Sequence, residues 1–527
     1  MIFCPTRTIS HLSGDAMNEN DILCDSHKPD DFLAALEQCQ CRLTDLDTQL
    51  TISADQLREG WSMLVRRFSE SGVIPGDRVI VAVGNGPQFI AVWGALLALG
   101  ASPVPVHCET PPMELHRTAC KFHASFVVTD NHLASDMEQA ESHAYTLECS
   151  NWARVVWTDI YSNGRSPGND RTLNLAGIPL HPTSGTTGEP KLSIRPMRTA
   201  IAEIDNYVNT FGIDSQDTIL GMTPMSHAFA HGFCAIAPVT TGANLVTMRK
   251  FQPKLVNRAC AELNITIIAA VAGVLDTMLF MGAAAMKNTA RKIFSGGGPL
   301  TERTARQYQQ TLGIVPRPLF GATETGGIAV AGEDELCIDG RVGRAFDGVA
   351  IKLVPYHGRD GEESGNGTEK DERPFSLVHV KSKSLMLGYV VDEEIDTRQF
   401  ESGWFNTGDL AHCDAYGALY LHGREAEVIN ISGMKVLPRE VEEIILALKG
   451  VNEVKVFGHK NQSGSSQLRA AVVADGLSAD EIRAHCRQQL VYYKQPSKIM
   501  MIAALPKNTN GKVSLVELAK LMQSEPS

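Results

Sequence analysis

The sequence has no excess of basic residues, no cysteine-dense segment and no long apolar run that is free of charge. It carries 48 Lys and Arg against 60 Asp and Glu over 527 residues, a formal net charge of -12. This balance disfavours long-range attraction to nucleic acid or to an anionic membrane. Any phosphate-binding site therefore has to be local.

The 12 cysteines are dilute in a chain of this length, and only Cys39 and Cys41 lie close together. Their spacing offers no metal-ligand pair, so we expect reduced, mostly buried thiols and a cytoplasmic enzyme. Residues 1–20 agree with this, because Thr6, Ser10 and Asp15 interrupt the stretch that a secretion signal needs to be apolar.

Residues 265–286 come closest to the length of a membrane span, since they are apolar apart from Thr266, Asp276 and Thr277. Asp276, near the centre, would be costly in lipid. Asn264 before the segment and Gly273 inside it favour a buried strand that turns into a core helix. We therefore predict no membrane span.

What the chain does contain is enough apolar material for a large core. Hydrophobic residues make up 43% of it and charged residues 20%, which is typical of a soluble globular protein. The length allows about three domain-sized units. Disorder as the dominant state is excluded.

Periodicity predicts an α/β fold. After a loose tail to about residue 30, apolar residues show helical spacing at 31–43 and 53–71, and a further helix is expected at 89–99. Short apolar runs indicate buried parallel strands at 79–83, 103–106, 126–129 and 154–157. The alternation of strand and helix predicts a domain built on a parallel sheet.

The pattern divides the chain into two domains. We predict a large N-terminal α/β domain with mixed or parallel sheets (1–422) and a small α+β domain (423–527). The small domain should contain a strand at 428–433, a helix that begins at Pro438 and a strand at 454–457. Polar stretches are predicted to be surface loops at 162–170, 357–374 and 461–466.

The segment Thr183-Ser-Gly-Thr-Thr-Gly-Glu-Pro-Lys191 follows an apolar run. Its glycines let the backbone curl around an anion, its hydroxyls donate hydrogen bonds, and Lys191 adds a positive charge. The spacing differs from that of a Walker loop. A flexible linker is the alternative, but a linker has no reason to end in Pro-Lys after a strand. The segment favours a polyphosphate site.

Four further segments follow in order: Phe320-Gly-Ala-Thr-Glu-Thr-Gly, Trp404-Phe-Asn-Thr-Gly-Asp409, Gly423-Arg424 with Gly433 beyond it, and Leu505-Pro-Lys-Asn-Thr-Asn-Gly-Lys512. Together with the first loop they resemble the adenylate-forming superfamily, which comprises acyl-CoA synthetases, aryl-CoA ligases, luciferases and the adenylation domains of peptide synthetases. The resemblance runs from about residue 57 to the C-terminus and is closest in type to acyl-CoA synthetases.

The resemblance implies ATP, Mg²⁺ and coenzyme A as cofactors. It implies that Phe320 packs on adenine, that Asp409 and Arg424 hold the ribose, and that the small domain is mobile. The implied catalytic residues are Lys512, Thr183, His227 and Glu324, with Glu324 and Thr187 at the metal. The implied nucleotide- and CoA-binding residues are Thr183, Ser184, Gly185, Thr186, Thr187, Gly188, Lys191, Gly297, Gly298, Phe320, Gly321, Ala322, Thr323, Asp409, Arg424, Gly433 and Lys435.

The implied function is ATP-dependent activation of a carboxylic acid to an acyl-adenylate, followed by transfer to coenzyme A. Peptide-synthetase domains carry a Phe-Asp pair for the α-amino group, and this chain has none near His227, so we expect an acid without an α-amino group. A fatty or an aryl acid fits, and we favour the fatty acid. The chain departs from the family pattern at Leu192, and around the second half-reaction at Ala426, Asn430 and Leu515. An acyl-AMP ligase that loads a separate carrier protein, or a non-catalytic nucleotide-binding relative, stays open as an alternative.

Overall fold

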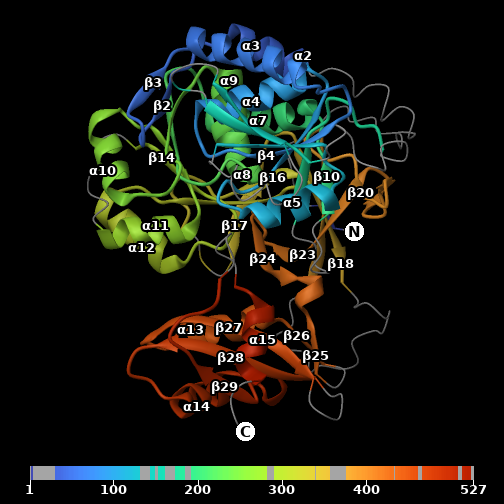
Figure 1. Ribbon diagram of the computed structural model, residues 1–527. Helices are drawn as coiled ribbons and strands as arrows, with labels where there is room; N and C mark the ends of the chain where they lie inside the picture. The colour runs from blue at the N-terminus through green and yellow to red at the C-terminus, as the bar shows by residue number, and fades with distance from the viewer. Residues whose placement is uncertain are drawn as a thin grey trace.

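The computed structural model describes residues 2–3, 30–130, 143–148, 152, 154–160, 173–183, 191–281, 290–336, 338, 340–356, 375–431, 434–460, 466–507 and 513–523. Figure 1 shows a large mixed α/β part and, in red, a small part. Strands β23 (Trp404–Cys413) and β24 (Leu419–Arg424) lie in the large part on the side of the small part. This architecture confirms the predicted fold class. The predicted loops at 162–170 and 357–374 lie outside the described residues, as does 461–465 of the third.

The first sheet has the strand order β5-β4-β6-β8-β7. Its strands are β4 (Arg78–Ala82), β5 (Ser102–Pro105), β6 (Phe126–Thr129), β7 (His143–Glu148) and β8 (Arg154–Asp159). Strand β4 pairs in parallel with β5 and β6, as predicted. The prediction of a parallel strand at 154–157 is wrong, because β8 runs antiparallel to both β6 and β7.

Caps and apolar faces explain where the helices of the large part begin and which side of each is buried. Helix α3 (Ala54–Glu70) begins at a capping box in which Ser53 and Gln56 exchange hydrogen bonds, so the prediction at 53–71 is confirmed. Helix α2 (Asp30–Gln38) is shorter than predicted, because residues 43–45 form strand β2 instead. The remaining helices of this part are α4 (Pro87–Ala98), α5 (Pro112–Lys121), α7 (Met197–Phe211), α8 (Ala228–Ala230), the π-helical η3 (His231–Ile236), α9 (Ala237–Thr241), α10 (Pro253–Glu262), α11 (Ala272–Met281) and α12 (Glu302–Leu312).

Within the described residues the largest sheet has 15 strands, in the order β1-β18-β19-β23-β24-β17-β16-β15-β14-β13-β11-β12-β2-β3 with β22 beside β23. Its strands are β1 (Ile2–Phe3), β2 (Leu43–Asp45), β3 (Leu50–Ile52), β11 (Thr218–Gly221), β12 (Asn244–Thr247), β13 (Ile267–Ala270), β14 (Lys292–Ser295), β15 (Arg317–Ala322), β16 (Gly326–Val330), β17 (Arg341–Ala345), β18 (Val349–Pro355), β19 (Ser376–Ser382), β22 (Phe400–Glu401), β23 (Trp404–Cys413) and β24 (Leu419–Arg424). Because Ile2 and Phe3 pair with β18, the predicted loose tail is wrong at these two residues.

A four-stranded sheet with the order β21-β20-β10-β9 carries the ends of the Gly-rich segment. Its strands are β9 (Leu180–Thr183), β10 (Lys191–Ile194), β20 (Tyr389–Val391) and β21 (Glu394–Asp396). Residues far apart in the sequence meet here, since Ser193 of β10 is the register partner of Tyr389 of β20.

The apolar segment near residue 270 forms the buried strand β13, as predicted. The prediction of a core helix after it is wrong, because only Leu275 and Met278 of α11 are buried and Phe280 is 92% exposed. The carboxylate of Asp276 accepts a hydrogen bond from Thr304 on α12. A lipid bilayer could not supply such a donor, so this contact agrees with the prediction that the segment does not span a membrane. Among the described residues, no helix is both long enough and apolar enough to cross a membrane.

The small part contains a three-stranded sheet, β27-β28-β29, and a two-stranded one, β25-β26. Its elements are β25 (Ile429–Ile431), β26 (Met434–Val436), α13 (Pro438–Leu446), β27 (Val451–Lys460), β28 (Ser466–Ala474), α14 (Ala479–Gln489), η6 (Tyr492–Lys494), β29 (Lys498–Met501) and α15 (Leu515–Gln523). The short helix η5 (Glu425–Glu427) joins it to β24. The boundary between residues 422 and 423 stays a prediction.

Strand β9 contributes His181 to a cluster of buried aromatic and imidazole rings. His231 has its ring centroid 4.4 Å from that of Trp93 and 5.1 Å from that of His181. Both histidines are only 3% exposed. Burial, with a smaller effect of Arg195, lowers the pKa of His231 from 6.5 to about 3. The imidazole is therefore neutral in the folded protein.

Lowering the pH from 7 to 5 should destabilise the fold by about 2 kcal/mol through His231 alone. The stabilisation is complete above the unfolded-state pKa of 6.5 and is lost as the pH falls towards the folded-state value of about 3. Urea unfolding at both pH values measures the difference. His231→Leu should show a correspondingly smaller loss, and an identical pH dependence in the two proteins would contradict the assignment.

Candidate active site

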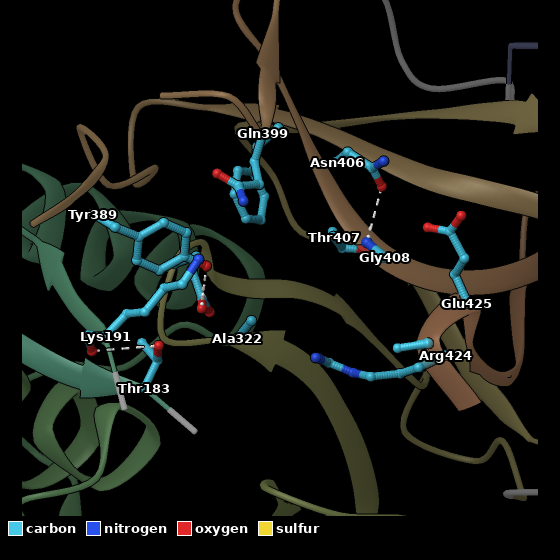
Figure 2. Close-up of a pocket in the computed structure, with 13 residues that line it drawn as sticks. Thr183, Lys191, Ala322, Tyr389, Gln399, Asn406, Thr407, Gly408, Arg424 and Glu425 are labelled. Atoms are coloured by element: carbon cyan, nitrogen blue, oxygen red, sulfur yellow. Dashed lines mark hydrogen bonds between the residues drawn. The ribbon is translucent and has the colours of Figure 1, made fainter. Parts of the chain in front are cut away.

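A cavity of about 240 Å³ opens where the four-stranded sheet meets the β15–β16 turn, strand β23 and the segment after β24. Figure 2 shows Lys191 extending into it beside Tyr389, with Arg424 approaching from the opposite side. The residues that line it are Thr183, Lys191, Ala322, Glu324, Tyr389, Gln399, Phe405, Asn406, Thr407, Gly408, Arg424, Glu425 and Ala426.

The two ends of the Gly-rich segment lie on this wall. Strand β9 ends at Thr183 and strand β10 begins at Lys191, and these two residues are register partners in an antiparallel pair. The hydroxyl of Thr183 donates to the carbonyl oxygen of Lys191 at 3.5 Å. The predicted phosphate-loop residues between them lie outside the described part of the chain: Ser184, Gly185, Thr186, Thr187 and Gly188.

Glu324 lies at the tip of the turn between β15 and β16. Its carboxylate oxygen Oε1 accepts a hydrogen bond of 2.7 Å from the hydroxyl of Tyr389, and its carbonyl oxygen accepts one of 2.8 Å from the backbone N–H of Met386. Ala322 is also on the cavity wall. Phe320, 9% exposed, packs in the core just before Gly321, and Thr323 is half-buried beside Glu324.

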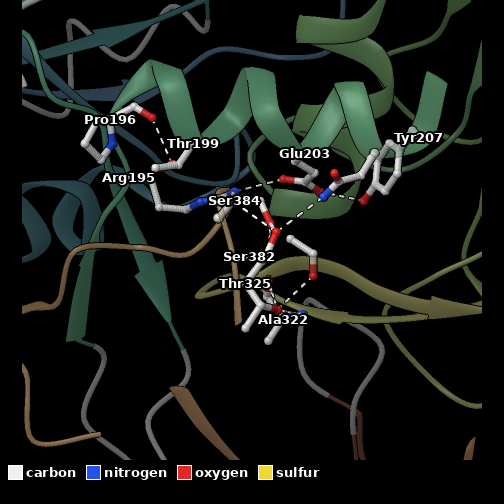
Figure 3. A network of polar contacts seen from close by, with 11 residues as sticks. Arg195, Pro196, Thr199, Glu203, Tyr207, Ala322, Thr325, Ser382 and Ser384 are labelled. Carbon is white, nitrogen blue, oxygen red and sulfur yellow. Dashed lines mark hydrogen bonds and ion pairs between the residues drawn. The ribbon is translucent and has the colours of Figure 1, made fainter. Parts of the chain in front are cut away.

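A buried polar network supports this turn from behind (Figure 3). Thr325 accepts a hydrogen bond from the hydroxyl of Ser384 at its carbonyl oxygen, and the carbonyl oxygen of Ser384 accepts one from Arg195. Arg195 forms a 2.9 Å ion pair with Glu203, and both side chains are 3% exposed. A Cβ at Gly326 would lie 2.6 Å from the carboxyl carbon of Glu203, so the backbone of the turn rests directly on this pair.

Asp409 and Arg424 come together because they are register partners on β23 and β24. Arg424 Nε lies 3.1 Å from Asp409 Oδ1, while Asp409 Oδ2 is buried and has no hydrogen-bond partner among the described residues. Burial raises the pKa of Asp409, although Arg424 acts in the opposite direction. A buried acceptor of this kind needs a donor, and a ligand with hydroxyl groups would supply one.

Of the other predicted site residues that the structure describes, His227, Gly297 and Gly298 do not line this cavity. His227 precedes helix α8, and its backbone N–H donates to the carbonyl oxygen of Pro224. Gly297 and Gly298 are exposed after strand β14. Gly433 and Lys512 lie outside the described residues, and for Lys435 the structure describes only its place in strand β26.

Sequence reasoning missed Tyr389, Gln399 and Glu425 on the cavity wall. Tyr389 follows Gly388 in an otherwise ordinary apolar run, so nothing local distinguishes it from a core tyrosine. Its place depends on the pairing of β20 with β10, which no short-range pattern indicates.

The donor set suits a magnesium nucleotide. Lys191 and Arg424 offer positive charge to phosphates, Asp409 offers an acceptor to ribose hydroxyls, and Glu324 offers carboxylate oxygen, the ligand that Mg²⁺ prefers. The fold and this cavity define an α/β enzyme with a nucleotide site.

Comparison with protein families shows to which family of nucleotide-binding enzymes the chain belongs. Residues 35–390 match the family of AMP-binding enzymes, and residues 440–512 match the C-terminal domain of AMP-binding enzymes. The chain belongs to this family.

Relatives and a solved structure agree with the assignment. The chain is 27% identical over 456 residues to the long-chain-fatty-acid–CoA ligase FadD13 of Mycobacterium tuberculosis, covering 84% of this chain and 87% of the relative. It is 26% identical over 488 residues to 2-succinylbenzoate–CoA ligase of Geobacillus kaustophilus, covering 91% and 95%. O-succinylbenzoate coenzyme A synthetase (MenE) of Bacillus subtilis, solved with ATP and magnesium ion, shares the fold with a TM-score of 0.74, 21% identity and coverage of 92% and 98%.

Proposed function

We propose that the protein is an AMP-forming acid–CoA ligase. The carboxylate of the acid attacks the α-phosphorus of ATP, the bond to the β-phosphate oxygen breaks, and pyrophosphate leaves. The thiol of coenzyme A then displaces AMP from the acyl-adenylate to give a thioester. Family membership supports the nucleotide chemistry, and the relatives named above are CoA ligases. The observation that carries the proposal is the buried Oδ2 of Asp409, which has no partner among the described residues and belongs to the side chain that pairs with Arg424 on the wall of a cavity also lined by Lys191.

In the first step, formation of the acyl-adenylate, the described residues have separate roles. Asp409 accepts hydrogen bonds from the ribose, and Arg424, which pairs with that carboxyl group, contacts the same sugar. Lys191 lies at the phosphate end of the cavity, where its charge offsets that of the triphosphate. Glu324, with Thr187 beyond the described residues, would hold Mg²⁺, which supplies charge neutralisation to the leaving pyrophosphate.

The remaining roles rest on the family resemblance. Ser184, Gly185, Thr186 and Gly188 complete the phosphate loop with Thr183, and Gly297, Gly298, Phe320, Gly321 and Thr323 border the nucleotide. His227 lies beside the acid carboxylate, Lys512 bridges the reacting anions, and Gly433 and Lys435 border the thiol path.

We favour a fatty acid as the substrate, with an aryl acid as the second candidate, and the cytoplasm as the location. FadD13 supports the first acid and 2-succinylbenzoate–CoA ligase the second. No Phe-Asp pair near His227 offers a counter-charge for an α-amino group, which disfavours amino acids.

A pyrophosphate-exchange screen over fatty, aryl and amino acids tests the proposal. We expect ATP–pyrophosphate exchange with one acid class, and thioester formation when coenzyme A replaces a holo-carrier protein as the acceptor. Exchange dominated by amino acids would overturn the choice of substrate. No exchange with any acid would overturn the proposed function, and transfer to the carrier protein alone would overturn coenzyme A as the acceptor.

A further inference from the structure

Tyr389 contacts both charged groups that the phosphate end of the cavity presents. Its hydroxyl donates a 2.7 Å hydrogen bond to Oε1 of Glu324, and the ammonium nitrogen of Lys191 lies 5.1 Å from the centroid of its ring. Figure 2 shows the ring standing beside the extended Lys191 side chain. The hydroxyl therefore forms a hydrogen bond with the carboxylate, and the face of the ring interacts with the ammonium cation.

The surrounding fold fixes the position of this ring. Tyr389 is 8% exposed, and its strand pairs with β10, the strand that begins at Lys191. Three residues earlier, the N–H of Met386 donates to the carbonyl oxygen of Glu324, so the same segment also holds the backbone of the carboxylate.

We propose that Tyr389 is a positioning residue that orients Glu324 for a divalent cation and holds Lys191 against the triphosphate. The inference rests on the proposed function and adds a residue to it. With Oε1 of Glu324 engaged by the tyrosine, the carboxylate is restrained, and its second oxygen would be free to hold a divalent cation, which would supply charge neutralisation there. An unrestrained glutamate would lose rotamer entropy on each binding event.

Tyr389→Phe tests the hydroxyl alone. The Mg²⁺ concentration for half-maximal pyrophosphate exchange should rise roughly tenfold, since a hydrogen bond to a charged group is lost. Binding of Mn²⁺ to the enzyme with a non-hydrolysable ATP analogue, followed by electron paramagnetic resonance, should weaken by a similar factor. The KM for ATP at saturating Mg²⁺ should change by less than about twofold, because the ring still faces Lys191.

Tyr389→Leu removes the ring as well, and the KM for ATP should then rise roughly threefold even at saturating Mg²⁺. Tyr416→Phe is the matched control, because Tyr416 is 80% exposed and lies off the cavity wall; it should leave both quantities unchanged. Thermal unfolding of each variant checks folding, and the conservative phenylalanine variant decides the hydroxyl question if the leucine variant unfolds.

Unchanged Mn²⁺ binding in Tyr389→Phe would overturn the inference, whatever the catalytic rate. Equal increases in the Mg²⁺ requirement and in the KM for ATP would also overturn it, since they would indicate general loosening of the site. A wild-type protein that shows no exchange with any acid would refute the proposed function instead, and Mn²⁺ binding with the analogue would still test Tyr389.

Discussion

Replacing Lys512 with alanine is expected to slow acyl-adenylate formation by about a hundredfold to a thousandfold. The first step joins a carboxylate to a triphosphate, so like charges repel and a cation that bridges them lowers the barrier most in the transition state. Thiol transfer from a supplied acyl-adenylate should change by much less, because one of the two anions has already left as pyrophosphate. ATP–pyrophosphate exchange measures the first step, and thioester yield from synthetic acyl-adenylate measures the second.

Lys507 provides the matched control for this experiment. In the sequence Lys512 lies between Lys507 and Val513, which form an isolated β-bridge, and Leu505 and Leu518 belong to one small core. Lys507 forms a 2.6 Å ion pair with Glu453 on the surface of the small domain. Lys507→Ala should therefore leave both steps nearly unchanged. Equal losses in the two steps for Lys512→Ala would contradict its proposed role.

The sequence predicted those strands and helices whose position depends on local apolar patterns. The apolar run predicted as a strand at 126–129 is strand β6, and the helical spacing at 53–71 corresponds to helix α3, whose start the structure shows to be a capping box of Ser53 and Gln56. Prediction was wrong where pairing decides the outcome. Residues 43–45 became a strand because β12 and β3 lie on either side of them, and the direction of β8 is set by its neighbours.

In the candidate site, too, some residues could be predicted from local motifs and others could not. Asp409 and Arg424 could be identified because each lies in a short motif with a family resemblance, and their meeting follows from the register of β23 and β24. Tyr389 could not be identified, because both of its contacts are with residues far away in the sequence. Glu324 is 65 positions away, and Lys191 lies on the distant strand β10. Roles that depend on long-range contacts are not encoded in any one segment.

The buried pair Arg195–Glu203 is local in the sequence, but it supports the site through a long-range contact of Arg195 with Ser384. Arg195 donates to both Glu203 and the carbonyl oxygen of Ser384, while Tyr207 donates to the other oxygen of Glu203. Every polar contact here is inside the protein, since both charged side chains are 3% exposed. Removing one charge would leave the other without compensation in a medium that solvates it poorly.

Arg195→Met should therefore lower the free energy of unfolding by about 3 to 5 kcal/mol. The double variant Arg195→Met, Glu203→Gln should recover part of this loss, because no unpaired charge is left behind. Urea unfolding at neutral pH measures both. Arg258→Met is the matched control: Arg258 pairs with Glu262 on the surface of helix α10, with side chains 53% and 56% exposed, and its loss should cost less than about 1 kcal/mol. If Arg195→Met cost no more than this control, the carboxylate of Glu203 would have to be neutral in the folded protein, and the β15–β16 turn that carries Glu324 would rest on a hydrogen-bonded acid instead of an ion pair.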